Sequence, residues 1–196
     1  MENAEKLVRA FELFDHANAQ DPNMECLDNG DAPKELVYAK RMSEVLDEFA
    51  PDASQALRLT ARCQHIRRWE IPRDSYPANR AGYLRWRQDL KRFHADKARD
   101  LLAQAGFDEE LIGQVEFLLL KKQLKKNEET QTLEDVICLV FLKYYFDDFL
   151  SKHPEDKIVD ILQKTWRKMS PKGHKAALAM EHSSKAGKLL SKALNG

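Results

Sequence analysis

The sequence predicts an all-α protein, a single-domain helical bundle of about seven or eight helices. Apolar residues recur at three- and four-residue spacing along most of the 196-residue chain, which is the period of an amphipathic helix. Only seven glycines and seven prolines interrupt this pattern, and no segment has the strict alternation of a half-buried strand. A chain of this length is expected to form one domain. We therefore expect a helical domain over residues 1–180 and a basic tail over 181–196 that is either a loosely docked helix or flexible.

Three helices are expected in the first third of the chain, over residues 3–17, about 33–49 and about 52–69. The segment between the first two, residues 17–31, is rich in Asp, Asn, Pro and Gly, a composition that favours a loop. Asp31 is expected to cap the second helix, with Pro33 in its first turn.

Residues 70–80 contain two prolines and are expected to form a loop. Further helices follow over about 80–105, 108–124, 131–151 and 155–169, and a last one starts at Ser170 and Pro171. Gly106 has the place of a glycine that ends a helix, and Asp108 that of an N-cap. The helix over 131–151 is apolar around most of its circumference, so it is expected to lie centrally.

Charge, cysteine content and missing motifs exclude several classes of protein. Lysine and arginine together number 32, as do aspartate and glutamate, whereas nucleic-acid-binding domains are usually strongly basic. The chain has no apolar run of about 18 residues and no apolar h-region near residue 1, so neither a membrane-spanning helix nor a secretory leader is expected. Its three cysteines have no metal-binding or redox spacing. It also lacks a Walker loop, a Rossmann glycine fingerprint, a serine-hydrolase elbow and a zinc-protease helix. We therefore expect a cytoplasmic protein with no membrane partner.

A cluster of arginines is the most distinctive local feature. Between Arg58 and Arg92 there are ten basic residues against three acidic ones, a local net charge of +7, interleaved with tryptophan and tyrosine. A guanidinium can bind phosphate or carboxylate bidentately, so we expect an anion-binding pocket with an aromatic wall. The expected substrate-binding residues are Arg68, Arg73, Arg87 and Lys122. The alternative is a set of arginines that stack on aromatic rings and pair with surface acids.

Four polar residues lie near the apolar faces of four successive predicted helices: His65, His94, Glu116 and Asp135. Buried imidazoles and carboxylates are costly unless they are paired or bound to a metal. Helical bundles often build metal sites from inward-facing His and carboxylate side chains of different helices. The set therefore points to metal or acid–base chemistry, and the alternative is a hydrogen-bonded core network.

Several sequence motifs resemble the uncharacterised domain of unknown function 4202 family. They are Phe14-Asp-His-Ala-Asn-Ala-Gln-Asp-Pro-Asn23, Pro33-Lys-Glu-Leu36, Gln64-His-Ile-Arg-Arg-Trp-Glu-Ile-Pro-Arg73, Ala81-Gly-Tyr-Leu-Arg-Trp-Arg87, Phe93-His-Ala95, Gln131-Thr-Leu-Glu-Asp-Val136 and Lys164-Thr-Trp-Arg-Lys-Met-Ser170. The resemblance covers nearly everything up to about Leu178. It implies membership of a family and no particular reaction.

The order of His65, then the stretch from His94 to Gly106, then Asp135 is also similar to the HD phosphohydrolase superfamily. That resemblance implies an HD-like helical arrangement and a divalent metal ion held or oriented by His65, His94 and Asp135. Two positions depart from the superfamily pattern. Ile66 stands where an Asp would follow the histidine, and Tyr38 or Arg41 stands where an earlier metal-binding histidine is expected.

These observations lead to two functional hypotheses. The first is metal-assisted hydrolysis of a phosphorylated small molecule or nucleotide, in which a metal-bound water attacks and Glu70 or Glu116 is the general base. The second is a non-catalytic protein on a degenerate HD-like scaffold, whose arginine-rich pocket binds a phosphate-bearing ligand or, less favoured, RNA. The retained His65, His94 and Asp135 favour the first hypothesis, and the two departures favour the second.

Overall fold

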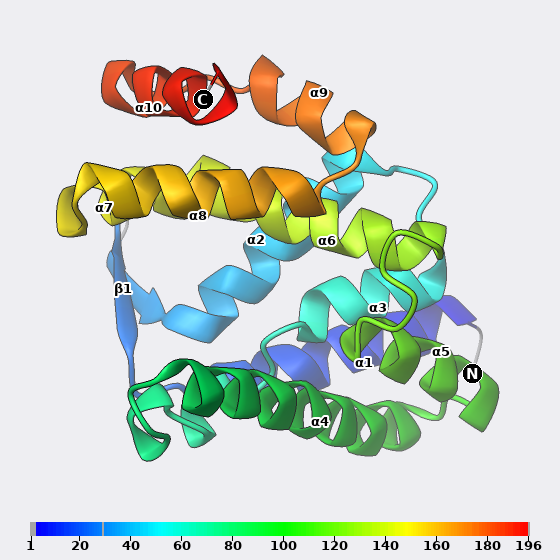
Figure 1. Ribbon diagram of the computed structural model, residues 1–196. Coiled ribbons are helices and arrows are strands. Elements are labelled where there is room, and N and C mark those ends of the chain that lie inside the picture. The colour runs from blue at the N-terminus through cyan, green and yellow to red at the C-terminus, as the bar shows by residue number, and fades with distance from the viewer. Residues whose placement is uncertain (1–2, 29, 196) are drawn as a thin grey trace. The chain divides into compact units, whose positions relative to one another are not determined.

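The computed structural model describes residues 3–28 and 30–195 (Figure 1). Within these ranges the chain forms ten α-helices and one small two-stranded sheet, so the predicted all-α class is confirmed. The count exceeds the expected seven or eight because the helix expected over 131–151 is assigned as two α-helices joined by a π-helical segment and because the C-terminal tail forms a helix of its own. The HD-like arrangement stays a prediction. No helix in the described part of the chain combines the length and apolar character needed to cross a membrane.

The chain divides into two compact units. One comprises Met1–Asp47 with Pro51–Lys122, and the other comprises Glu48–Ala50 with Gln123–Gly196. The prediction of a single domain over residues 1–180 stays a prediction.

The first unit is built around α4 (Arg80–Ala105), the longest helix, drawn in green in Figure 1. It packs against α1 (Asn3–Asn18) and α5 (Glu109–Leu119), and α3 (Gln55–Cys63) packs against both of these. Large apolar side chains of these helices are fully buried, among them Phe14, Leu59, Leu102 and Ile112. This core positions α4, which carries Arg87 and His94, and the end of α3, which leads into His65.

A hairpin occupies part of the segment that was expected to be a loop. Strand β1 (Met24–Leu27) pairs antiparallel with β2 (Gly30–Pro33), with Met24 opposite Pro33 and Leu27 opposite Gly30. Four-residue strands are too short to show a reliable alternation in the sequence. Gly30 has φ 113°, a left-handed value that glycine adopts without steric cost, and this lets the chain reverse into β2.

The predicted cap of the second helix was wrong. Pro33 belongs to β2, and α2 runs over Lys34–Phe49. The side chain that caps it is Asp21, whose Oδ2 accepts a hydrogen bond of 3.0 Å from the backbone N–H of Glu35. Asp21 is 14 residues away in sequence, so no local capping pattern could reveal it.

Two predicted helices end earlier than their apolar pattern suggested. Helix α3 begins after Ser54, which caps it, and ends at Cys63 instead of residue 69. The chain then turns through Arg67, whose φ of 49° is left-handed. Helix α5 ends at Leu119 instead of residue 124. There, Lys121, Gln123 and Lys125 all have positive φ, which ends any regular helix.

The predicted start of α4 and its end at Gly106 are confirmed. Asn79 caps the helix through the N–H of Gly82, at 2.8 Å, and Gly106 takes a left-handed φ of 88° at the other end. Gly82 also allows a close approach. A Cβ at this position would lie 2.2 Å from the carbonyl oxygen of Pro77, so only glycine lets the preceding loop pack against α4.

The second unit contains the predicted apolar rod and the helices after it. The rod runs without interruption through α6 (Glu128–Val140), the π-helical segment η3 (Phe141–Tyr145) and α7 (Phe146–Lys152). Helix α8 (Glu155–Lys168) and α9 (Pro171–Ala179) follow. Trp166 is half-buried and stacks on His174, with ring centroids 4.0 Å apart. The C-terminal tail forms α10 (Ser184–Asn195), which packs on α8 and buries Ala186, Leu189, Leu190 and Ala193.

Candidate functional site

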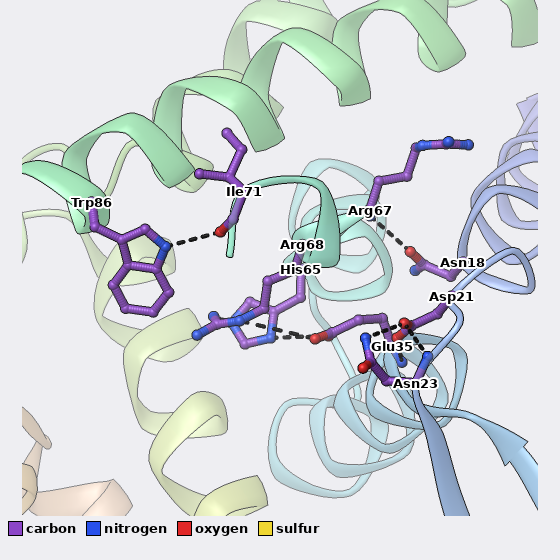
Figure 2. A network of polar contacts seen from close by, with 9 residues as sticks. All are labelled: Asn18, Asp21, Asn23, Glu35, His65, Arg67, Arg68, Ile71 and Trp86. Carbon is purple, nitrogen blue, oxygen red and sulfur yellow. Dashed lines mark hydrogen bonds and ion pairs between the residues drawn. The ribbon is translucent and has the colours of Figure 1, made fainter. Parts of the chain in front are cut away.

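A polar network at the start of α2 and the end of α3 forms the candidate site of the first unit (Figure 2). Glu35 lies in the first turn of α2 and is 7% exposed. His65 lies in the turn after α3, and Arg68 opens the short 3-10 helix η1 (Arg68–Glu70). The turn is held by buried Asn18, whose Oδ1 accepts a 3.0 Å hydrogen bond from the backbone N–H of Arg67. We define the His65 centre as Glu35, His65, Arg68, Arg87 and His94.

Both ring nitrogens of His65 are engaged. Its Nδ1 lies 3.3 Å from Glu35 Oε2, and its Nε2 lies 3.0 Å from Nη1 of Arg68. A guanidinium can only donate, so Nε2 of His65 accepts and the proton of the neutral ring sits on Nδ1, the nitrogen that lies near Glu35. Arg68 Nε is also 3.9 Å from Glu35 Oε1. The three side chains therefore close a ring of polar contacts, as Figure 2 shows.

A second histidine lies beside this ring of contacts. The ring centroids of His65 and His94 are 5.8 Å apart. His94 is 5% exposed, and its Nε2 is buried without a hydrogen-bond partner among the described residues. Tyr38 stacks on the face of His65, with ring centroids 4.1 Å apart and planes at 12°. Tyr38 thus covers the ring of His65. It is one of the two residues that stand where an early metal-binding histidine was expected.

The site holds its imidazoles uncharged and raises the pKa of its carboxyl group. Burial, and then the charges of Arg68, Lys121 and Arg87, lower the pKa of His65 well below its usual value. Burial, and then the neighbouring His65 and Arg68, lower the pKa of His94 in the same way. Burial also raises the pKa of Glu35 to about 7, against the opposing effect of Arg68.

Two arginines lie close to aromatic rings next to the site. The guanidinium carbon of Arg68 lies 5.1 Å from the ring centroid of Trp86, and that of Arg73 lies 5.9 Å from the same ring and 6.0 Å from Tyr83. Arg73 also donates to the carbonyls of Tyr76 and Pro77. Trp86 is fixed by a 3.0 Å hydrogen bond from Nε1 to the carbonyl of Ile71. Stacked arginines, one of the two expected arrangements, are therefore present for Arg68 and Arg73.

Arg87 differs from these arginines. It is half-buried on α4, and it forms no hydrogen bond or ion pair with any residue that the structure describes. Its charge nevertheless acts on both histidines, because it lowers the pKa of each. Lys122, the fourth expected ligand of an anion, follows α5, and its N–H donates to the carbonyl of Phe117. Among Arg68, Arg73 and Arg87, it is thus Arg87 whose guanidinium has no partner in the described part of the chain and is available to a ligand.

Two predicted general bases are engaged elsewhere. Glu70 is exposed and pairs with Arg67. Glu116 receives two hydrogen bonds from Arg99, at 2.6 and 2.8 Å. The carboxylate that contacts His65 is Glu35, which was not among the predicted site residues. Its only signal in the sequence was its place in the motif Pro33-Lys-Glu-Leu36. Whether Glu70 or Glu116 has a catalytic role stays a prediction.

Asp135, the third predicted metal ligand, belongs to the second unit. It is 2% exposed, and its carboxylate accepts hydrogen bonds from the N–H of Ser170 at 2.8 Å, from the hydroxyl of Ser170 at 2.5 Å and from Gln131 at 3.2 Å. Over residues 3–28 and 30–195, no group of three or more His, Cys, Asp or Glu is arranged to hold a metal ion. The metal site stays a prediction, and it would require Arg68 to release Nε2 of His65.

The raised pKa of Glu35 leads to a prediction for the pH dependence of stability. The pKa of glutamate in an unfolded chain is about 4.3, so between that pH and about 7 the folded protein binds more protons than the unfolded chain. This group therefore makes the free energy of unfolding fall as pH rises through that window. Glu35→Gln removes the titration and keeps an acceptor for His65. We expect the variant to gain about 3 kcal/mol over the wild type between pH 4.5 and 8, measured by urea denaturation.

The two histidines have the opposite effect, because their lowered pKa values make the folded protein less stable as pH falls below about 6.5. They are present in both proteins, so their contribution cancels in the difference. A difference in unfolding free energy that stays constant across this pH range would contradict the proposed ionisation of Glu35.

Comparison with known proteins gives one match. A family model described as "Domain of unknown function (DUF4202)" matches residues 8–190. No curated protein and no solved structure matches the chain. The match covers the residues of the His65 centre and the whole of α6.

Proposed function

We propose a function for this chain, which belongs to the domain of unknown function family DUF4202: its His65 centre binds a phosphate-bearing small molecule. The description of the family names no reaction, so the proposal rests on the geometry of the first unit. Its substrate class is a compact anion, and the binding groups are Arg87, Arg68 and His94.

One observation carries the proposal. A half-buried guanidinium without a partner among the described residues, Arg87, acts on the same two histidines as the paired Arg68. A buried charge is costly unless it is compensated, and a phosphate accepts the parallel N–H bonds that a guanidinium offers. The unpartnered Nε2 of His94 adds a further buried polar atom. In the neutral tautomer that carries its proton on Nε2, His94 would donate a hydrogen bond to the same anion.

Hydrolysis of the bound phosphate ester is the second candidate function. The observation that favours it is the contact between Glu35 and Nδ1 of His65, because a carboxylate that orients an imidazole is a recurrent arrangement for general-base catalysis. In the metal-assisted form of this proposal, His65, His94 and Asp135 would hold a divalent ion that supplies an acidic water.

We also propose a cytoplasmic location, because Cys26, Cys63 and Cys138 are free thiols and free thiols are typical of reducing compartments.

Isothermal titration calorimetry with inorganic phosphate and adenosine monophosphate tests the binding proposal. Arg87→Ala removes two charge-assisted hydrogen bonds, and we expect it to weaken binding about 10- to 100-fold. Arg85→Ala is the matched control, because Arg85 lies on the same helix with 80% of its side chain exposed and pairs with Asp89. Equal effects of the two substitutions, or no saturable binding in the wild type, would refute the proposed site.

Phosphate release from adenosine monophosphate separates binding from hydrolysis. The assay is run after chelation and again with added manganese, in the wild type and in Glu35→Gln. Turnover that requires Glu35 would support hydrolysis. Saturable binding without turnover in either condition would leave the binding function alone.

A further inference from the structure

A cavity in the second unit has features that the His65 centre does not explain. It has a volume of about 450 Å³, within the range of small-molecule sites. Its lining combines three lysines with an aromatic ring and side-chain amides, from Phe49, Lys125, Lys126, Asn127, Gln131 and Lys172. All of these residues belong to the unit that comprises Glu48–Ala50 and Gln123–Gly196. We call this feature the lysine cavity.

The ammonium groups of the three lysines are not paired with any side chain that the structure describes. Within residues 3–28 and 30–195, the side chains of Lys125, Lys126 and Lys172 form no hydrogen bond and no ion pair. Lys172 Nζ lies 4.5 Å from the ring centroid of Phe49, a cation–π contact that holds this ammonium group at the cavity. Other lysines of the same unit do find carboxylates, as Lys143 does with Glu48 and Lys164 with Asp160. These three exposed ammonium groups are thus gathered at one cavity and are free to meet an anion there.

The backbone segment that carries Lys125 and Lys126 is strained. Lys121, Gln123 and Lys125 have φ values of 53°, 55° and 70°, and the left-handed region is unfavourable for residues that carry a Cβ. Strained residues persist only where the surrounding structure holds them, and they cluster at binding sites. Lys125 is one of these residues and also lines the cavity. The strain and the unpaired charges are independent observations at the same place.

We infer that the lysine cavity binds a phosphate or pyrophosphate group of a small molecule through Lys125, Lys126 and Lys172. An ammonium group binds phosphate as a point charge from any direction, so three of them around one cavity suit a multiply charged anion. Two carboxylates also line the cavity. The carboxylate of Asp135 keeps its negative charge, but its oxygens already accept hydrogen bonds from the N–H and hydroxyl of Ser170. That of Glu128 has no partner among the described residues, so it opposes the anion.

Titration calorimetry with sodium pyrophosphate tests this inference. All variants carry Arg87→Ala as well, so that anion binding at the His65 centre does not contribute to the signal. We expect one saturable site, weakened at least fivefold by Lys126→Ala and by Lys172→Ala. Lys175→Ala is the matched control, because Lys175 is exposed on the same helix as Lys172 and lies outside the cavity lining. Glu128→Gln is expected to tighten binding. If the His65 proposal fails, only the difference in phosphate binding between the wild type and Arg87→Ala is affected. The results for the three lysine variants and for Glu128→Gln do not depend on it.

Lys125→Gly adds a readout that a structural role would not produce. Glycine relieves the strain at this φ, so we expect a higher midpoint of thermal unfolding together with weaker pyrophosphate binding. Equal weakening by Lys175→Ala and Lys172→Ala would show attraction to general positive charge and would overturn the inference. Absence of saturable binding, or no tightening by Glu128→Gln, would overturn it as well.

Discussion

Replacing Gly82 by alanine is expected to lower the free energy of unfolding by about 3 kcal/mol. The new Cβ would lie 2.2 Å from the carbonyl oxygen and 3.0 Å from the carbonyl carbon of Pro77. Both contacts are with backbone, so no side-chain rotation can relieve them. Either the loop before α4 or the first turn of α4 must move. The gain in helix propensity from glycine to alanine, about 1 kcal/mol, is too small to offset this clash.

The change should also disturb the candidate site, because the displaced loop carries Arg73 and Ile71. Urea denaturation followed by far-ultraviolet circular dichroism measures the stability, and phosphate titration measures the site. Gly113→Ala is the control in the same unit. It lies within α5, and nothing is within 4 Å of its added Cβ, so it should stabilise the protein by up to about 1 kcal/mol. If Gly82→Ala were as stable as the wild type, the close packing of this loop would be disproved.

Asp135→Ala should cost about 3 kcal/mol, because it leaves the N–H and the hydroxyl of Ser170 without their acceptor. Each unsatisfied buried group costs about 1–3 kcal/mol. The carboxylate also packs closely against Gly173, since a Cβ at that position would lie 2.7 Å from Oδ1, so its removal leaves a gap beside Gly173. Ser170 also caps α9 through the N–H of Gly173, at 3.0 Å. The substitution therefore loosens the junction between α6 and α9.

A comparable Asp–Ser contact at the surface provides the control. Asp147 accepts a 2.6 Å hydrogen bond from the hydroxyl of Ser183, but this contact is exposed, so Asp147→Ala should cost less than about 1 kcal/mol. Both variants are measured with and without a chelator. If Asp135 is structural, its loss costs the same in both conditions. A cost that vanishes after chelation would identify Asp135 as a metal ligand instead.

The helical class and several helix ends could be predicted from the sequence because their causes are local. Gly106 adopts the left-handed conformation that its position implied, and Asp108 and Ser170 accept hydrogen bonds from N–H groups three residues ahead. The apolar rod of residues 131–151 was also evident, because its side chains are apolar whatever they pack against. Each of these features depends on residues within about one helical turn.

The sequence also indicated four of the five residues of the His65 centre. His65 and His94 were identified as histidines near apolar faces, and the structure brings their rings together. Arg68 and Arg87 were expected to supply positive charge, and that charge acts on both rings. Composition and periodicity were sufficient here because an imidazole or a guanidinium on a buried face is unusual wherever it occurs.

Only the tertiary structure decided which side chains meet. Glu35 contacts His65 across 30 positions of the sequence, Asp21 caps α2 from 14 residues away, and Asp135 binds Ser170 across 35 residues. Carboxylates have many possible partners, so the sequence offered Glu70 and Glu116 as equally good bases. The fold places Glu35, at the start of α2, beside His65 in the turn after α3. Burial then strengthens the contact of this carboxylate with its nearest donor. Periodicity identifies the residues that are buried, and the crossing of distant segments determines their partners.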